Sequence, residues 1–287
     1  MDEYRFHRQE LLFGKEGQDR LQKCRVAIIG LGGLGSHVAQ QLAYLGVESF
    51  LLIDKDRASD SNLNRLIGAT ENDARLEALK VDIAERMIKT ILPHANILKI
   101  PTSFISEEAL ARLQNVEFVF GCVDNDASRL VLNEFCQAYG QRYIDIATDI
   151  DPEDKRFGGR MLFADGRVCV SCKRLLNDEA VRARFSSERQ RQEDDRIYGI
   201  HRGALGQTGP AVVSLNGILA SVAVTEFMVE VTGVRPAHLY LEYKGTMGLI
   251  RDQEMPDFDC YYCKSLRGIG VKADVERYIR EGWGERL

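Results

Sequence analysis

The residues that most clearly suggest chemistry are four glycines near the N-terminus, in the run GLGGLG: Gly30, Gly32, Gly33 and Gly35. An apolar run (VAII) precedes them, and small and apolar residues that favour a helix follow. Glycines at a strand-to-helix junction allow a tight turn and let phosphate oxygens approach the backbone N–H groups at the helix N-terminus. Asp54 ends the next apolar run, where a carboxylate can accept hydrogen bonds from ribose hydroxyls. These features predict a nucleotide site, either of a dehydrogenase or of an enzyme that consumes ATP.

Charged and amide side chains further along the chain favour ATP. Asn62 and Arg65 follow Asp54 closely, Lys80 comes on the next predicted helix, and Asp124 ends the fourth apolar run. Because the carboxyl ends of parallel strands meet at one edge of a sheet, these groups are expected to converge there. Hydride transfer needs no such set, whereas arginine and lysine neutralise the β- and γ-phosphates and aspartate holds Mg²⁺. The sequence therefore predicts a site for Mg²⁺ and ATP.

A second candidate site comes from two Cys-x-x-Cys pairs, Cys169 with Cys172 and Cys260 with Cys263. Two thiolates at this spacing can bind one metal ion, and two such pairs complete a tetrahedral zinc site. A closed shell of four cysteines leaves no open position for a substrate, so the predicted zinc site is structural. The alternative, a thioredoxin-like redox motif, requires only one pair in a different βαβ context.

The elements that must position these groups follow from the hydrophobic pattern. Between residues 25 and 147 short apolar runs alternate with segments of helical periodicity, which predicts the order β-α-β-α-β-α-β-α-β. One helix is predicted over residues 73–92, ending before Pro93. The fold class is therefore α/β, with a doubly wound, mostly parallel, Rossmann-like sheet that continues into a mixed or antiparallel C-terminal half.

The second half of the chain shows a different pattern. Residues 158–170 predict a hairpin with an Asp-Gly turn, and residues 173–202 predict a solvated helix or a mobile crossover loop. A long apolar helix is predicted over residues 208–233, beginning near Pro210 and too often interrupted by polar residues to span a membrane. Two strands and a short terminal helix complete the prediction.

The overall composition excludes some classes of protein. Of the 287 residues 45% are hydrophobic and 28% are charged, as in an ordinary globular chain. A net charge of −5 argues against general nucleic-acid binding. The chain has neither an uninterrupted apolar run long enough to span a membrane nor the apolar core of a signal peptide at its N-terminus, so we expect no membrane partner and a cytoplasmic location.

Taken in order, these residues resemble a known family. The segments RFHRQ, GLGGLG, DKDRASDSNLNR and CVDN, a lysine on the helix after the third of these, and both cysteine pairs resemble the bacterial form of the ubiquitin-activating-enzyme superfamily, the ThiF/MoeB/HesA-type adenylyltransferases. The resemblance implies a single adenylation domain over residues 1–287. It would comprise an N-terminal arm (1–24), a nucleotide-binding half (25–150) and a half that binds zinc and docks the carrier (151–287), with a crossover loop at 173–207.

The resemblance also implies the roles of individual residues. Those expected to bind ATP are Gly30, Gly32, Gly33, Gly35, Asp54, Asp56, Ser61, Asn62, Arg65, Lys80, Asp124 and Asn125. Those expected to take part in catalysis are Arg8, Asn62, Arg65, Lys80 and Asp124. Asp124 matches the Mg²⁺ ligand, and Arg8 matches an arginine that reaches the partner's active site in the family's homodimers. The stretch from Arg65 to Lys80 is slightly longer than is usual in the family.

The reaction implied is attack of a protein C-terminal carboxylate on the α-phosphate of ATP, with a small β-grasp ubiquitin-like or sulfur-carrier protein as substrate. Many relatives then form a thioester on a crossover-loop cysteine, but no cysteine lies between Lys173 and Pro210. Cys24, Cys122 and Cys136 are predicted to be core residues, so no cysteine thioester is expected.

The next step of the reaction therefore has two alternatives. The adenylate passes to a sulfurtransferase or conjugating enzyme, or to a hydroxyl such as that of Ser186, Ser187 or Thr208. Adenylation of a peptide or another carboxylate, and a non-catalytic partner subunit, are the competing functions.

Overall fold

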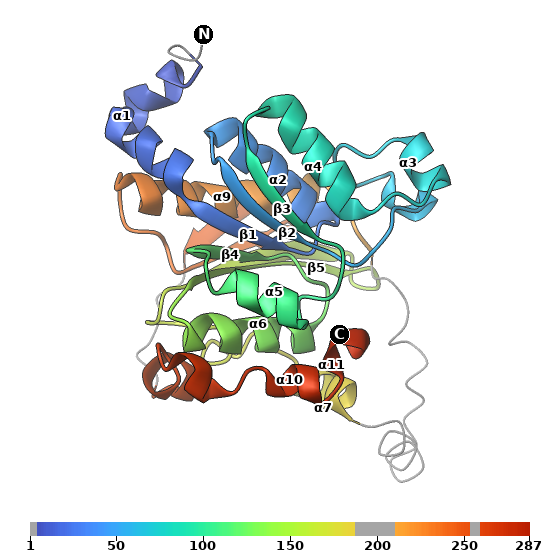
Figure 1. The fold of residues 1–287 in the computed structure, drawn as a ribbon. Helices are drawn as coiled ribbons and strands as arrows, with labels where there is room; N and C mark the ends of the chain where they lie inside the picture. The colour runs from blue at the N-terminus through green and yellow to red at the C-terminus, as the bar shows by residue number, and fades with distance from the viewer. Residues whose placement is uncertain (1–4, 187–209, 253–258) are drawn as a thin grey trace.

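The computed structural model describes residues 5–186, 210–252 and 259–287. In this part of the chain the strands form one sheet of order β3-β2-β1-β4-β5-β6-β7-β8 (Figure 1). Their bounds are β1 Arg25–Ile29, β2 Ser49–Ile53, β3 Asn96–Ile100, β4 Phe118–Gly121, β5 Arg142–Asp151, β6 Arg156–Ala164, β7 Tyr240–Lys244 and β8 Leu249–Asp252.

The sheet changes character at β5. Strands β3, β2, β1, β4 and β5 are parallel, whereas β6, β7 and β8 are added antiparallel. The chain leaves β1 for β2 on one side and returns to β4 on the other, which opens a crevice at the carboxyl ends of β1 and β4. The predicted doubly wound sheet with an antiparallel continuation is confirmed. One sheet runs through both predicted halves, and β5 crosses the boundary placed at residue 150.

Helices cover both faces of the sheet (Figure 1). Packed around the first core are α1 His7–Lys23, α2 Gly33–Leu45, α4 Lys80–Ile91 and α9 Val213–Thr232. Around the second core are α5 Glu107–Leu113, α6 Asp126–Ala138, α7 Asp178–Phe185, α10 Arg277–Arg280 and α11 Trp283–Arg286. The short elements are α3 Glu71–Arg75, the 3₁₀ turns η1 Asp60–Asn62 and η3 Gly270–Ala273, and the π-turn η2 Tyr261–Ser265.

Local sequence explains how the site-bearing helices begin and end. The chain enters α2 directly from the glycine run and leaves it at Gly46, whose φ of 90° is the left-handed conformation that ends many helices. Helix α6 begins at Asn125, whose side chain accepts a hydrogen bond from the Ser128 N–H at 2.8 Å. These two helix N-termini therefore lie directly after β1 and β4.

The helix predicted over residues 73–92 is interrupted, so that prediction was wrong. Helix α3 ends at Arg75, and Glu77 takes a φ of 48°, which is incompatible with a continuous helix. The break is compensated by pairing with the chain after β2, because the Ala58 N–H donates to the Ala78 carbonyl at 2.8 Å and the Lys80 N–H to the Asp56 carbonyl at 3.0 Å. Lys80 consequently becomes the first residue of α4, beside the end of β2.

Two further predictions need correction. Residues 158–170 do not form a hairpin: β6 is one strand that pairs with β5, the turn lies at residues 152–155, and the chain after the Asp-Gly pair leads into the cysteine turn. Strand β6 lies inside the sheet and most of its residues are buried on both faces, so its continuous apolar run did not reveal where the strand begins and ends. Helix α9 begins at Val213, three residues after Pro210.

Helix α9 is long and apolar enough, by length and composition alone, to cross a membrane. In the structure it packs against α1, α2, β5 and β6, and 56% of its most apolar window is buried. Phe227 lies edge-on against Phe118 and Phe120, with ring centroids 4.9 and 5.5 Å apart. Helix α9 is therefore a core helix of this fold.

Candidate nucleotide-binding site and cysteine cluster

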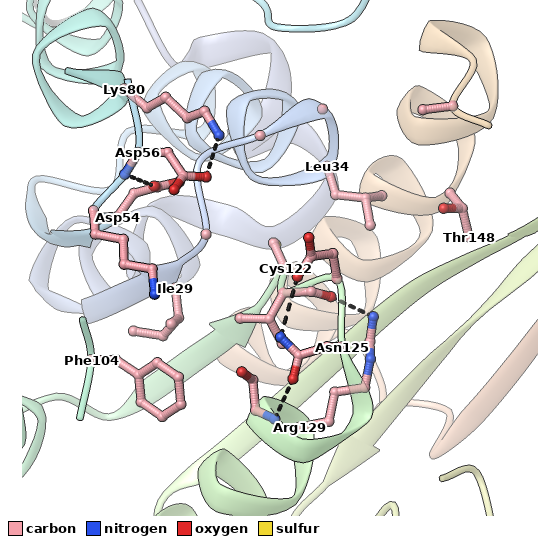
Figure 2. A pocket seen from close by; sticks show the side chains of 18 of the residues that line it. Ile29, Leu34, Asp54, Asp56, Lys80, Phe104, Cys122, Asn125, Arg129 and Thr148 are labelled. Atoms are coloured by element: carbon pink, nitrogen blue, oxygen red, sulfur yellow. Dashed lines mark hydrogen bonds and ion pairs between the residues drawn. The ribbon is translucent and has the colours of Figure 1, made fainter. Parts of the chain in front are cut away.

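A cavity of about 600 Å³ lies at the carboxyl ends of the parallel strands. Its lining comes from the segments that follow β1, β2, β3 and β4, with contributions from β5, α7 and α9 (Figure 2). The predicted nucleotide residues that line it are Gly30, Gly32, Gly33, Asp54, Asp56, Arg65, Lys80, Asp124 and Asn125. The structure thus brings together most of the residues singled out from the sequence.

Four predicted site residues do not line the cavity. Gly35 is buried, and a Cβ at this position would lie 1.9 Å from the Gly30 carbonyl oxygen, so its absence of a side chain serves helix packing. Ser61 and Asn62 lie on η1, where the Asn62 side chain accepts a hydrogen bond from the Ser59 N–H at 3.3 Å. Arg8 is an exposed residue of α1. The nucleotide roles of these residues stay predictions.

Asp54 holds the glycine run in place. Its side chain is 9% exposed, and its two oxygens accept hydrogen bonds from the Leu31 N–H at 2.6 Å and the Asp56 N–H at 2.8 Å. Burial raises the pKa of the Asp54 carboxyl, while the charge of Lys80 and the two backbone donors act in the opposite direction. The remaining lone pairs can accept hydrogen bonds from ribose hydroxyls.

Lys80 and Asp56 point toward one another across the cavity wall (Figure 2). The Lys80 ammonium lies 2.7 Å from the Asp56 carboxylate, and the side chains are 12% and 56% exposed respectively. An ammonium beside a partly exposed carboxylate can exchange that partner for a phosphate. The ion pair therefore keeps Lys80 at the cavity but competes with any anion that enters it.

This competition makes a prediction. Asp56→Asn is expected to lower the KM for ATP about fivefold, because a partly exposed ion pair worth about 1 kcal/mol no longer has to open. Steady-state kinetics over a range of ATP concentrations measure this effect. Asp82→Asn is the matched control, since it breaks an equally short pair between Asp82 and Lys99, at 2.7 Å, whose residues do not line the cavity. A higher KM in Asp56→Asn would show instead that this carboxylate assists nucleotide binding.

Asp124 and Asn125 form the turn between β4 and α6. Asp124 is exposed, and its carboxylate accepts a hydrogen bond from the Asn125 side chain at 3.3 Å. Asn125 also caps α6, so its residue type has a local structural explanation beside the predicted nucleotide contact. The Asp124 carboxylate does not cap α6, and its exposed oxygens can bind a cation.

A buried arginine, Arg129, stabilises this turn through hydrogen bonds to backbone carbonyls. The Arg129 guanidinium donates to the Val123 carbonyl at 2.6 Å, to the Ile146 carbonyl at 3.1 Å and to the Asp145 carboxylate at 2.5 Å. Asp145 is 0% exposed, so the pair is shielded from water. Arg129 thereby ties the residue before Asp124 to the neighbouring strand β5.

Several lining residues were missed in the sequence. They include Thr102, Ser103 and Phe104 after β3, Thr148, Asp149 and Ile150 on β5, Arg129 on α6, Arg184 on α7 and Asn216 on α9. The segment after β3 could have been found, because ligands bind at the carboxyl ends of parallel strands. The helical residues carry no local signal, since only tertiary packing brings them to the cavity.

The cysteine pairs meet in one cluster. The sulfur atoms of Cys169, Cys172, Cys260 and Cys263 all lie within 4.8 Å of one another. Hydrogen bonds within the cluster lower the pKa of the Cys172 thiol and raise the pKa of the Cys169 and Cys263 thiols, so Cys172 is the first of these three to become the thiolate that a metal requires. Zinc–sulfur bonds of about 2.3 Å in a tetrahedron fit sulfurs at this separation. The cluster is therefore consistent with the predicted structural zinc site.

The other cysteines differ in their surroundings. Cys24 and Cys136 are buried, as predicted, whereas Cys122 is half-buried: it packs against the first core and also lines the cavity. It follows β4 directly, which brings it to the sheet edge. Burial raises the pKa of Cys24 and of Cys122 to about 12, so both thiols are protonated at neutral pH and are poor nucleophiles.

Only the first part of the predicted crossover loop falls within the described residues. There α7 brings Arg184 to the cavity, and the Ser186 hydroxyl donates to the Arg182 carbonyl at 2.7 Å. The loop beyond residue 186, including Ser187, and Thr208 after it lie outside the described residues.

Known proteins resemble this chain in sequence. The family model described as the ThiF family matches residues 6–262. The molybdopterin-synthase adenylyltransferase of Escherichia coli (strain K12) is 33% identical over 183 residues, which cover 62% of this chain and 70% of that protein. The sulfur carrier protein adenylyltransferase of Thermus thermophilus is 33% identical over 178 residues, which cover 61% of this chain and 60% of that protein. The molybdopterin-synthase adenylyltransferase of Haemophilus influenzae is 36% identical over 137 residues, which cover 47% of this chain and 56% of that protein.

Solved structures resemble it in fold. A crystal structure of E. coli MccB with AMPCPP and MccA superposes with a TM-score of 0.71 at 18% identity, covering 92% of this chain and 74% of that one. The structure of PaaA gives a TM-score of 0.65 at 21% identity, covering 87% of this chain and 72% of that one. At such identities the likeness concerns the fold alone. The family match spans nearly the whole chain, and together with the glycine run, the convergent cavity and the cysteine cluster it shows that this chain belongs to the ThiF family.

Proposed function

We propose that this chain catalyses the ATP- and Mg²⁺-dependent adenylation of the C-terminal carboxylate of a small ubiquitin-like or sulfur-carrier protein. The observation that carries the proposal is the convergence of Arg65, Lys80 and Asp124 on the cavity that begins at the glycine run. The names of the relatives from E. coli and Thermus thermophilus support it, because both are adenylyltransferases.

The chemistry follows from these groups. A carboxylate oxygen of the carrier bonds to the α-phosphorus of ATP, and the bond from that phosphorus to the oxygen bridging to the β-phosphate breaks. Pyrophosphate leaves with the electron pair, and the acyl-adenylate remains. The nucleophile is already ionised at neutral pH, so no general base is needed. Catalysis therefore rests on positioning and charge neutralisation.

Each residue has a distinct task in this proposal. Asp54 accepts hydrogen bonds from the ribose, and the backbone N–H groups of the glycine run face the phosphates. Arg65 and Lys80 neutralise the β- and γ-phosphates, with Lys80 exchanging Asp56 for phosphate. Asp124 would hold Mg²⁺, which supplies further neutralisation of the phosphate charge when bound.

The assembly and the later steps extend the proposal. We place Arg8 in the cavity of a second copy, in a homodimer, because it is exposed on α1 and does not line its own cavity. The adenylate passes to a separate sulfurtransferase or conjugating enzyme in the cytoplasm, since the thiols of Cys24 and Cys122 are poor nucleophiles. The cysteine cluster holds structural zinc.

The test is exchange of radiolabelled pyrophosphate into ATP, with the purified sulfur carriers of molybdopterin and thiamin synthesis as substrates. Exchange is expected with a carrier that has its intact C-terminus and not with the same carrier shortened by its last residue. Mass spectrometry of the reaction then separates a free adenylate from a covalent ester on the enzyme. Absence of exchange despite ATP binding would favour a peptide or another carboxylate as substrate. Absence of ATP binding would favour a non-catalytic subunit.

A further inference from the structure

An asparagine that the proposed mechanism does not use lies at the cavity. Asn216 is in the first turn of α9 and lines the cavity, although the residue is only 3% exposed. Its side chain makes no hydrogen bond within the part of the chain that the structure describes. The amide atoms of Asn216 are not among the fully buried, unpartnered side-chain atoms of the described residues, so they reach the cavity, where a ligand can complete their hydrogen bonds.

The amide lies against the first residue of α2. A Cβ atom placed on Gly33 would be 2.2 Å from the Asn216 Nδ2 atom and 3.3 Å from the Arg65 Cδ atom. Gly33, the Asn216 amide and the stem of Arg65 therefore meet at one point, and any side chain at position 33 would collide with the amide. The groups that surround the N-terminus of α2 are therefore backbone N–H groups, the Asn216 amide and the Arg65 side chain.

Helix packing fixes the position of this amide. Helices α2 and α9 are in contact, and one residue after Asn216 a Cβ on Gly217 would lie 3.4 Å from the His37 ring. The Asn216 backbone N–H donates to the Val212 carbonyl at 3.1 Å, which continues the helix toward its N-terminus. The amide is therefore carried on a rigid element, and it is preorganised before a ligand binds.

The donors at this point identify the ligand as a phosphate. A helix N-terminus favours an anion, and an amide N–H and a guanidinium both donate hydrogen bonds to phosphoryl oxygens. Of the three phosphates of ATP, the α-phosphate, which is attached to the ribose, is the one expected to lie at this point. Asp54, the proposed ribose ligand, accepts from the Leu31 N–H at 2.6 Å, and Gly33 follows Leu31 by two residues.

We propose that Asn216 is a further catalytic residue, whose side-chain N–H donates a hydrogen bond to a non-bridging oxygen of the α-phosphate of ATP. The proposal rests on the adenylation function argued above, and it adds the Asn216 amide to the groups that contact the reacting α-phosphate. Negative charge on this oxygen grows as the carrier carboxylate attacks, so a fixed donor stabilises the transition state more than the ground state.

The test compares ATP with adenosine, which lacks every phosphate. Asn216→Leu replaces the amide by an apolar group of similar size, and calorimetric titration measures its affinity for both molecules. ATP binding is expected to weaken about tenfold, the effect of losing one hydrogen bond to a charged group, whereas adenosine binding stays within about twofold. In pyrophosphate exchange kcat is expected to fall about a hundredfold, more than ATP binding does, as for a lost oxyanion donor. Asn216→Asp, which places a carboxylate against the phosphate, is expected to weaken ATP binding further.

Asn133→Leu is the matched control. Asn133 is also a helical asparagine, 0% exposed and with both amide atoms unpartnered, but it does not line the cavity. This control is expected to leave both affinities unchanged. If Asn216→Leu does not fold, Asn216→Ala gives the same comparison without adding atoms.

Equal weakening of ATP and adenosine in Asn216→Leu, or unchanged ATP binding and unchanged kcat, would overturn the inference while wild-type exchange upholds the proposed function. Failure of the wild-type protein to bind ATP would overturn both.

Discussion

Asp124→Asn is expected to lower the rate of adenylation by about a thousandfold while the melting temperature stays within about 2 °C of wild type. The reason is a separation of roles within one turn. The Asp124 carboxylate is exposed, and it accepts a hydrogen bond from the Asn125 side chain at 3.3 Å. Asparagine has the same shape but lacks the negative charge that Mg²⁺ requires, so the adenylation rate is expected to fall while the stability of the fold is kept. Pyrophosphate exchange at several Mg²⁺ concentrations, together with thermal unfolding, measures both effects.

The control is Asp60→Asn. Asp60 is likewise an exposed carboxylate in a turn after a parallel strand, but it does not line the cavity. Its replacement is expected to change the exchange rate by less than about twofold, because surface charges away from a site contribute little. A rate for Asp124→Asn close to that of wild type would remove this residue from the mechanism.

Cys260→Ser is expected to produce the largest loss of stability, a fall in melting temperature of more than about 10 °C, with loss of bound zinc. Cys260 and Cys263, after β8, lie beside the turn of Cys169 and Cys172 after β6; three of the four are buried in the core that covers one face of the sheet, and Cys172 packs against it. Without the metal this part of the core holds unsatisfied thiols in place of a cross-link. Metal analysis and thermal unfolding, with and without a chelator, measure the effect.

Cys136→Ser provides the comparison, since Cys136 is a buried cysteine of the same core that does not belong to the cluster. A smaller loss of stability with full zinc content is expected, because the buried hydroxyl has a desolvation cost but no metal ligand is lost. If chelation removed the zinc and left the melting temperature unchanged, the cluster would have no stabilising role.

Much of the fold could be predicted because its signals are local. The apolar runs of β1, β2 and β4 are buried on both faces, and glycine at the end of α2 and asparagine at the start of α6 mark helix ends by their own backbone and side-chain chemistry. The cavity residues on loops after these strands followed from the topology.

The failures have tertiary causes. The helical periodicity of residues 73–92 is real, but pairing of residues 57–58 with residues 78–79 outweighs it and divides the helix. The Asp-Gly pair after β6 turns the chain without returning it along a strand. Arg129 and Asn216 lie on helices whose sequence pattern indicates only a buried face. Their polar atoms face the cavity because of tertiary packing, which the sequence pattern does not predict.

The buried ion pair of Arg129 and Asp145 also restricts how this sequence can evolve. Removing either partner leaves the other buried charge with only a longer ion pair, from Asp145 to Arg160 at 3.8 Å or from Arg129 to Asp126 at 3.6 Å, at a cost of about 3 kcal/mol, which is a large part of the stability of a typical domain. Single substitutions that remove either charge therefore pass through a less stable protein. The turn before α6 is consequently constrained in evolution by an ion pair that the proposed chemistry does not use.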